Sequence, residues 1–278
     1  MLEYDFMQTA FAAATIVAVV AGCVGYFLVL RGQTFAGHAL AHVGFTGATG
    51  AVLIGAPPLA GLVLLTVIAG IGMGLLGERL AQRDVAIGVV LTLSLGLGLL
   101  FLHFFTSFAT QATTLLFGNV LAVDPGTVWA LVVLGAICLG TLAVISRPLL
   151  FVSLQPELAA AKGVPARFYS VLFLAIVALA TAECAQIVGV LLVFSLMVGP
   201  AAAAQRLTTN VLGGIALSAS LALVEAWAGL TLAYYTDWPT SFWISALSAL
   251  IYLLATLPTG RWFSLPETSR ALNQEPPS

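Results

Sequence analysis

The feature that most constrains this chain is a succession of long apolar runs with almost no charged residues between them. Only 7% of the 278 residues are charged and 61% are hydrophobic, whereas soluble domains carry about 25% charged residues. Most runs are close to the roughly 20 residues that a helix needs to cross a bilayer, and their continuous pattern disfavours barrel strands. The sequence predicts an all-α, polytopic membrane helical bundle with runs at 7–30, 35–55, 58–77, 85–105, 127–145, 168–205, 211–235 and 241–257.

The run 168–205 is too long for one crossing. It contains Gly189, Gly199 and Pro200, which are residues that interrupt helices. A split near Gln186–Gly189 gives nine transmembrane helices, and eight is the alternative if the run stays whole.

The nine basic residues set the expected orientation. With nine crossings all of them fall on one side of the membrane: Arg31, Arg79, Arg83, Arg147, Lys162, Arg167, Arg206, Arg261 and Arg270. Basic residues accumulate in cytoplasmic loops, so the N-terminus is expected outside and the C-terminus in the cytoplasm. Residues 1–261 then form the transmembrane domain, and the polar, proline-containing stretch 262–278 is expected to be a disordered cytoplasmic tail.

Several enzyme classes are excluded by the motifs that the sequence does not contain. Its single lysine, Lys162, precedes Gly163 and Val164, whereas a P-loop ends in Gly-Lys-Ser/Thr. Neither HExxH, the zinc protease motif, nor the GxSxG elbow of hydrolases occurs. We therefore expect a non-enzymatic protein without its own ATPase site, either a transporter subunit or a membrane scaffold.

Two histidines, His38 and His42, interrupt the second apolar run. Four residues apart on a helix, they share a face with their Cβ atoms about 6 Å apart, so both imidazoles can reach one metal ion. An ionisable side chain within a membrane usually has a function, which favours a metal-ligand role. The alternative is a pair of histidines that hydrogen-bond to neighbouring helices.

Three further ionisable residues lie in apolar runs. His103, in FLHFF, suits an aromatic belt at the membrane surface, with a metal relay as the weaker interpretation. Glu183 and Glu225 must find partners or be protonated if they are buried. Glu225 could orient a metal-binding histidine or merely pack in its protonated form, and the residues alone do not separate these roles. Glu183 is a weaker candidate for a metal relay or for the same supporting role.

The loop 155–167 contains a short helical pattern, QPELAAAKGVPAR. Proline at the start and glycine just after the end are the residues expected at helix termini. A helix here would suit docking of a cytoplasmic partner through the loop's residues Pro156, Glu157, Lys162, Gly163 and Pro165. A simple solvated loop is the alternative.

Five stretches together resemble the permease subunits of ABC importers for zinc, manganese and related divalent metals. In order within residues 25–210, they are FLVLRGQTFAGHALAHVGFTG, DVAIGVVLTLSLGLGLLFL, LLFGNVLAV, QPELAAAKGVPAR and IVGVLLVFSLMVGPAAAAQRL. The family's second helix has a basic residue, a small-residue turn and Gly-Asp-x-x-x-His. By position, His38 and His42 match the family's metal-binding Asp and His, so this chain has histidine in place of the aspartate.

The resemblance implies a type II-like ABC importer permease in a bacterial plasma membrane. It implies three kinds of protein partner: a second permease copy, two cytoplasmic P-loop ATPases docked on the 155–167 loops, and an extracytoplasmic metal-binding protein. No nucleic acid and no permanently bound cofactor are expected, because the metal is cargo moved by alternating access. Imidazole suits zinc better than manganese, so zinc is favoured, with manganese or iron next.

Two rival functions remain open at this stage. The first is a permease for a metal chelate such as a siderophore or cobalamin. The second is a membrane assembly protein that transports nothing.

Overall fold

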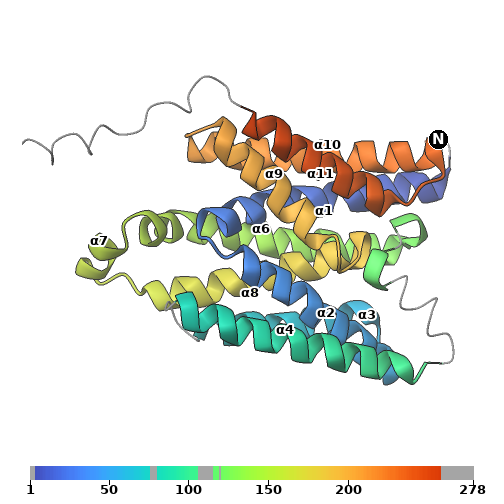
Figure 1. The fold of residues 1–278 in the computed structure, drawn as a ribbon, viewed down its shortest axis with the longest axis horizontal. Coiled ribbons are helices and arrows are strands. Elements are labelled where there is room, and N and C mark those ends of the chain that lie inside the picture. The colour runs from blue at the N-terminus through green and yellow to red at the C-terminus, as the bar shows by residue number, and fades with distance from the viewer. Residues whose placement is uncertain (1–3, 76–79, 106–114, 119, 258–278) are drawn as a thin grey trace, which may run out of the picture.

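A computed structural model describes residues 4–75, 80–105, 115–118 and 120–257, and its secondary structure is helical throughout (Figure 1). Within these residues nine helices have 15 or more residues, as the nine-helix prediction requires. They are α1 (Asp5–Leu30), α2 (Thr34–Leu53), α3 (Pro58–Leu75), α4 (Leu80–His103), α6 (Pro125–Leu154), α8 (Ala166–Val188), α9 (Val193–Leu207), α10 (Val211–Thr236) and α11 (Thr240–Thr256). Two short elements are α7 (Pro156–Ala161) and η1 (Val120–Ala122).

The split predicted in the run 168–205 is confirmed between α8 and α9. Gly189 ends α8 with a φ of +84°, a conformation that glycine adopts without strain. The chain then pairs with an earlier segment: the Val190 and Leu191 amides donate to the carbonyls of Leu115 and Leu116 at 3.3 and 3.2 Å. The short break between α8 and α9 is therefore anchored by backbone hydrogen bonds.

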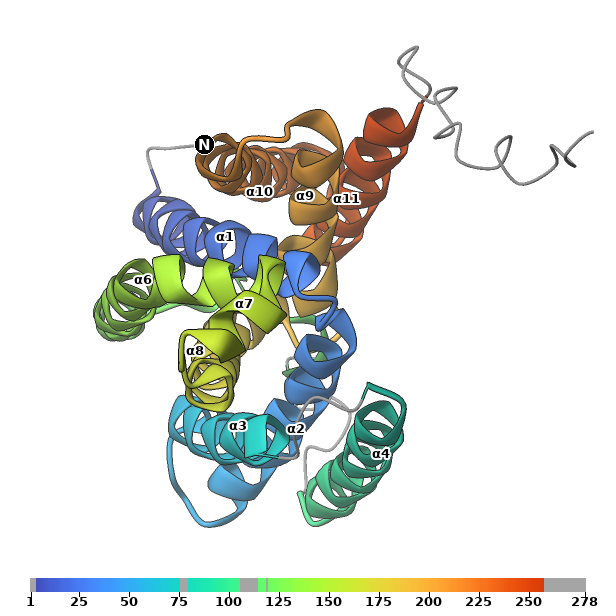
Figure 2. The same ribbon diagram turned by 90° about the vertical axis from the view of Figure 1, so that its left-hand side faces the viewer.

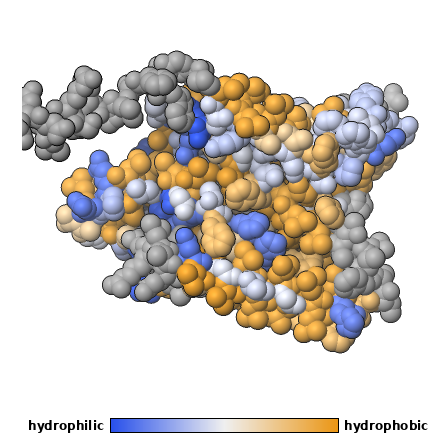
Figure 3. Space-filling view, viewed as in Figure 1, coloured by the Kyte–Doolittle hydropathy of each residue, from blue (hydrophilic) through white to orange (hydrophobic). Residues whose placement is uncertain are grey.

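The lengths and compositions of the helices fit a multi-pass membrane protein. Six helical spans within the described residues are long and apolar enough to cross a bilayer, and the 17-residue α11 is a shorter apolar helix. Hydrophobic surface covers much of the body of the molecule in Figure 3. α2 is 20 residues long but is not among the six, because its histidines, threonines and glycines make it less apolar.

Two of the basic residues predicted to share one side of the membrane, Arg31 and Arg167, lie at the same end of the molecule. α7 and the N-terminus lie at opposite ends of the molecule (Figure 1). Arg31 donates hydrogen bonds to the hydroxyls of Ser153 and Ser170, just before and just after α7, at 2.6 and 2.7 Å. Arg167 donates to the carbonyl of Leu75 at 2.9 Å, so the end of α3 lies there too.

Some predictions lie outside the described residues. They concern the tail 262–278 and the basic residues Arg79, Arg261 and Arg270.

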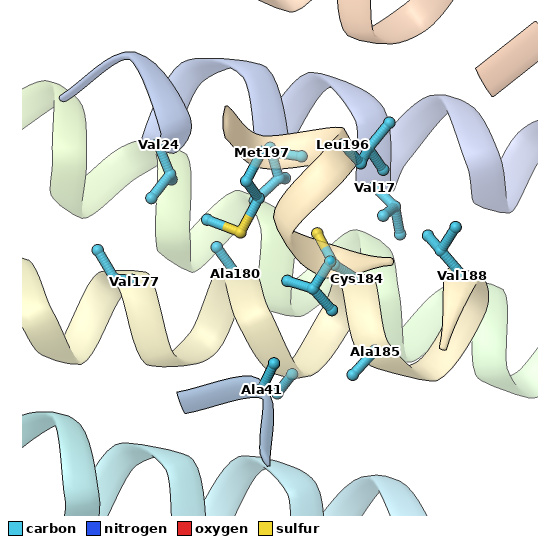
Figure 4. Close-up of a cluster of buried hydrophobic side chains, with 14 of the residues drawn as sticks. Val17, Val24, Ala41, Val177, Ala180, Cys184, Ala185, Val188, Leu196 and Met197 are labelled. Carbon is cyan, nitrogen blue, oxygen red and sulfur yellow. The ribbon is translucent and has the colours of Figure 1, made fainter. Parts of the chain in front are cut away.

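The core forms where α1, α8 and α9 meet. Figure 4 shows Leu196 and Met197 of α9 between α1 and α8, with Ala41 of α2 pointing toward α8. Small residues allow this close packing: a Cβ on Gly25 would lie 1.9 Å from the Met197 carbonyl oxygen. Close approach of backbones at small residues is the usual way in which membrane helices associate. Here it places α9 directly against α1.

Candidate metal site

His38 and His42 lie on one face of α2, as their spacing predicts. Their ring centroids are 4.9 Å apart and the ring planes meet at 84°. His38 is half-buried, and His42 is 7% exposed, with its Nδ1 atom buried and without a hydrogen-bond partner. An unpartnered imidazole nitrogen in an apolar interior is available to bind an ion.

Two neighbouring helices flank the histidine face. On one side the Phe194 ring of α9 approaches His38 edge-on, with centroids 5.7 Å apart. On the other side Thr46, one turn after His42, donates its hydroxyl proton to the Ser94 carbonyl of α4. Figure 2, viewed from the α7 end, shows α2 between α9 on one side and α3 and α4 on the other. The pair is therefore held between parts of the bundle that are far apart in sequence.

The chemistry of this arrangement suits brief binding of a metal ion. Zinc accepts imidazole nitrogen, and two donors leave other coordination positions open. Within the described residues no three His, Cys, Asp or Glu side chains lie close enough together to hold a metal ion. Two ligands on one chain, unlike a closed cage, leave a bound ion open to exchange.

The other ionisable candidates do not join the pair. His103 is exposed at the last residue of α4, with its ring 5.9 Å from that of Phe104, as a belt residue would be. Glu183 and Glu225 are both fully buried, and no carboxylate oxygen of either has a hydrogen-bond partner. Glu183 faces α6, with one oxygen 3.7 Å from where a Cβ on Gly135 would lie. A metal relay at these residues, or support of a metal-binding histidine by one of them, stays a prediction.

The loop 155–167 contains the predicted short helix. α7 has Pro156 at its first position, and Gly163, with a φ of +71°, follows its end. The five residues proposed for docking are exposed, whereas Ala159 is fully buried. They are Pro156, Glu157, Lys162, Gly163 and Pro165. The helix is confirmed, and docking of a partner on it stays a prediction.

A cavity of about 260 Å³ opens at the end of the molecule opposite α7. Its polar lining includes Asp124, Thr127 and Gln186. Asp124 caps α6 by accepting hydrogen bonds from the Thr127 hydroxyl and amide at 2.5 and 3.0 Å. These bonds hold the pKa of the Asp124 carboxyl below its ordinary value, so a negative charge persists at this opening.

The sequence reasoning did not identify Phe194, Thr46 or Ser94 as neighbours of the histidines. Phe194 lies within the stretch 187–207, and Ser94 within 84–102, that resemble the permease family, yet nothing local indicates what either contacts. Both contacts join residues that are far apart in sequence.

Comparisons with known proteins agree with this architecture. Residues 3–258 match the family model of the ABC 3 transport family. A manganese import system permease protein, ScaB of Streptococcus gordonii, is 30% identical over 254 residues, covering 91% of each chain. The manganese transport system membrane protein MntC of Halalkalibacterium halodurans is 29% identical over 256 residues, covering 92% of this chain and 88% of the relative.

A solved structure has the same fold. It is PsaBC from Streptococcus pneumoniae in complex with Fab, with a TM-score of 0.83, 28% identity and 92% coverage of both chains. Together, the matching family model, the relatives and this fold confirm the resemblance seen in the motifs. The chain belongs to the ABC 3 transport family and is a multi-pass permease subunit of an ABC transporter.

Proposed function

We propose that this chain is the membrane-spanning subunit of an ATP-driven importer of divalent transition-metal ions, which bind to His38 and His42 in transit. The observation that carries the proposal is the imidazole pair on α2, 4.9 Å between ring centroids, with a buried nitrogen that has no partner. The names of the relatives, which describe manganese transport, support a divalent metal as the cargo.

Within this class zinc is the favoured ion. Imidazole nitrogen suits zinc, copper, iron and nickel, whereas carboxylate and carbonyl oxygens suit manganese. His38 stands where the resembling family has an aspartate, which replaces an oxygen donor by a nitrogen donor. Manganese is the main competitor, because it is the metal named for the relatives.

The remaining parts of the transporter follow from the permease role. A second copy of this chain completes the pathway, two cytoplasmic P-loop ATPases dock on the two α7 helices, and an extracytoplasmic protein delivers the metal. The exposed α7, at the end where Arg31 and Arg167 lie, supports a cytoplasmic docking site there. The N-terminus then faces outward and the C-terminus faces the cytoplasm of a bacterial cell.

Transport proceeds by alternating access. Closure of the ATPases on ATP pushes α7, which is linked to α6 through Gln155 and to α8 through residues 162–165. Both α6 and α8 pack against α1, so movement of α7 reaches the core. The ion enters from the outer end, binds the two imidazoles and leaves toward the cytoplasm when the pathway reopens. Weak binding by few ligands permits that release.

The test is metal uptake by the complete transporter in liposomes. His38→Ala combined with His42→Ala is expected to abolish uptake of radioactive zinc, while Thr92→Ala, an exposed threonine of α4, provides a control for insertion and assembly. Uptake at the wild-type rate by the double variant would refute the site. Parallel assays with manganese, iron and a ferric chelate separate zinc import from its rivals.

A further inference from the structure

The turn between α1 and α2 carries an arginine that reaches both of the helices next to α7. Arg31 directly follows α1, and this turn lies toward the α7 end of the molecule (Figure 1). One terminal nitrogen of its guanidinium donates to the hydroxyl of Ser153 at 2.6 Å, and the other donates to the hydroxyl of Ser170 at 2.7 Å. Ser153 lies in the last turn of α6 and Ser170 lies near the start of α8. Arg31 therefore bridges the start of the histidine-bearing helix to both helices that α7 connects.

The contacts of Arg31 use the shape of its side chain. A guanidinium is planar and holds its donors in a fixed fork, so it can keep two bonds at once, whereas lysine offers one compact ammonium. The Ser153 hydroxyl donates its own proton to the Leu149 carbonyl at 2.5 Å, so toward Arg31 it accepts. The guanidinium carbon also lies 5.5 Å from the ring centroid of Phe173, a fully buried residue of α8. Contacts with two different helices thus fix the position of the arginine head.

The last turn of α6 belongs to the same structural unit as α7. The Ala159 amide donates to the Gln155 carbonyl at 2.9 Å, and the Gln155 amide donates to the Phe151 carbonyl at 3.0 Å. The ammonium of Lys162 lies 5.7 Å from the centroid of the Phe151 ring. Pro148, inside α6, has no amide proton and so removes one hydrogen bond between this last turn and the rest of the helix. A push on α7 should therefore move the end of α6 with it.

On the other side of Arg31 the connection into α2 is short and hydrogen-bonded. Gly32 has a φ of +62°, which glycine adopts without strain. The amides of Gly32 and Gln33 donate to carbonyls in the last turn of α1, both at 3.0 Å. α2 begins directly after Gln33, and His38 lies in its second turn. A displacement of Arg31 is therefore passed to the start of α2 and is not absorbed by a long loop.

We infer that Arg31 is a positioning residue that couples α7 to the metal-binding helix: its two bonds make the turn before α2 follow the ends of α6 and α8. The inference rests on the proposed transport by His38 and His42 and on ATPase docking at α7. Without the bonds, α7 would still move and ATP would still be hydrolysed, but α2 would follow less. α2 also packs directly against α8, so the number of ions moved per ATP should fall and not vanish.

The test is the ratio of zinc ions imported to ATP hydrolysed by the complete transporter in liposomes. Arg31→Met keeps an apolar stem and removes both bonds, and it is expected to lower this ratio about tenfold, the effect of one lost charge-assisted hydrogen bond on an equilibrium. Arg31→Lys, which can keep one bond, should lie between Arg31→Met and the wild type. Arg206→Met removes the same charge from an exposed arginine that donates to the Tyr252 hydroxyl at 3.1 Å, and it should keep the wild-type ratio.

The serines test the same contact from the opposite side. Ser153→Ala combined with Ser170→Ala should lower the ratio as Arg31→Met does, and adding Arg31→Met to this pair should lower it no further. Ser146→Ala is the matched control, because that hydroxyl donates to the Ala143 carbonyl of its own helix at 2.8 Å. A merely structural role would lower the melting temperature and leave the ratio of the assembled complex unchanged. A wild-type ratio in the assembled serine variant, which also decides the question if Arg31→Met does not assemble, would overturn the coupling role.

A second measurement follows α2 whatever the cargo is. Phe35 is 40% exposed in the first turn of α2, so Phe35→Cys introduces a thiol there, with the partly exposed native Cys23 changed to serine. Its rate of modification by a thiol reagent is expected to change severalfold when vanadate traps the ATPases, and this change should be lost in Arg31→Met. A change that persists in Arg31→Met would overturn the coupling role. If the change required Arg31 while the double variant of His38 and His42 imported zinc normally, the transport site would be wrong and the coupling role would stand.

Discussion

α2 and α7 represent two ways in which a sequence builds a functional element. α7 is a six-residue, largely exposed helix whose ends are specified by Pro156 and Gly163 within its own segment. α2 is largely buried, and its histidine face is completed by Phe194 of α9 and Ser94 of α4. Substitutions in α7 should therefore change only the coupling of uptake to ATP hydrolysis. Substitutions around α2 should change the affinity and selectivity for the ion, and their effects should depend on residues that are distant in sequence.

The largest expected effect is a charge placed under α7. Ala159 is the buried residue of this helix, so Ala159→Asp would require burial of a carboxylate and should displace α7. We expect nearly complete loss of ATP-driven uptake with zinc binding retained, measured by uptake and by equilibrium binding. Ala160→Asp, at the exposed neighbouring position, is the control for folding of the permease. Normal ATPase attachment to the Ala159→Asp permease would contradict the assignment of α7 as the docking helix.

A change of donor at the site should change the preferred ion. His38→Asp exchanges a nitrogen ligand for an oxygen ligand and restores the residue that the family pattern places there. Because manganese prefers oxygen donors, the ratio of zinc to manganese uptake is expected to fall by about tenfold, which corresponds to about 1.4 kcal/mol. His42→Asp serves as the comparison, since it moves the oxygen one turn along α2. An unchanged ratio in His38→Asp would show that selectivity is determined elsewhere.

The same contrast explains what the sequence could predict. Helix number, the break at Gly189 and α7 follow from apolar length, glycine and proline, which are local signals. The shared face of His38 and His42 follows from helical periodicity. The position of Phe194 does not, because it depends on how α9 packs against α1 and α8, through contacts such as that of Gly25 with Met197. The separation of Glu183 and Glu225 from the histidines likewise required the tertiary structure.

A smaller effect is expected at the contact between α9 and α2. Phe194→Ala removes the ring edge beside His38, and an aromatic pair contributes about 0.5–1.5 kcal/mol. We expect KM for zinc to rise by about threefold, with the maximal rate preserved, in initial-rate uptake assays. Phe194→Leu keeps an apolar side chain without the ring, so its KM for zinc should lie between those of the wild type and Phe194→Ala. A fall in maximal rate at constant KM would instead place Phe194 in the conformational step.

Protons should compete with the metal at the imidazole pair. A metal ligand must be unprotonated, so zinc affinity depends on pH, and uptake is expected to decline on the acid side of the pH optimum. In the double variant of His38 and His42, any residual uptake should lack this acid limb. Uptake measured across a pH series gives the result, and an acid limb that survives in the double variant would assign it to another group.

The smallest effect is expected at the cavity beside Asp124, a residue whose capping bonds, like the ends of α7, are made within its own segment. Asp124 caps α6 through Thr127 and is exposed, so it attracts a cation only weakly. Asp124→Asn retains a side chain that can cap the helix but removes the charge, and it should slow uptake by less than about twofold at low salt.

The hydrogen bonds from Thr127 lower the pKa of Asp124 below its ordinary value of 3.8. The charge is therefore present throughout the neutral range and is lost only as the pH falls through that lowered value. Any difference between the wild type and Asp124→Asn should accordingly shrink with added salt and not with mild acid, and a difference that resists salt would indicate direct contact with the ion at this opening.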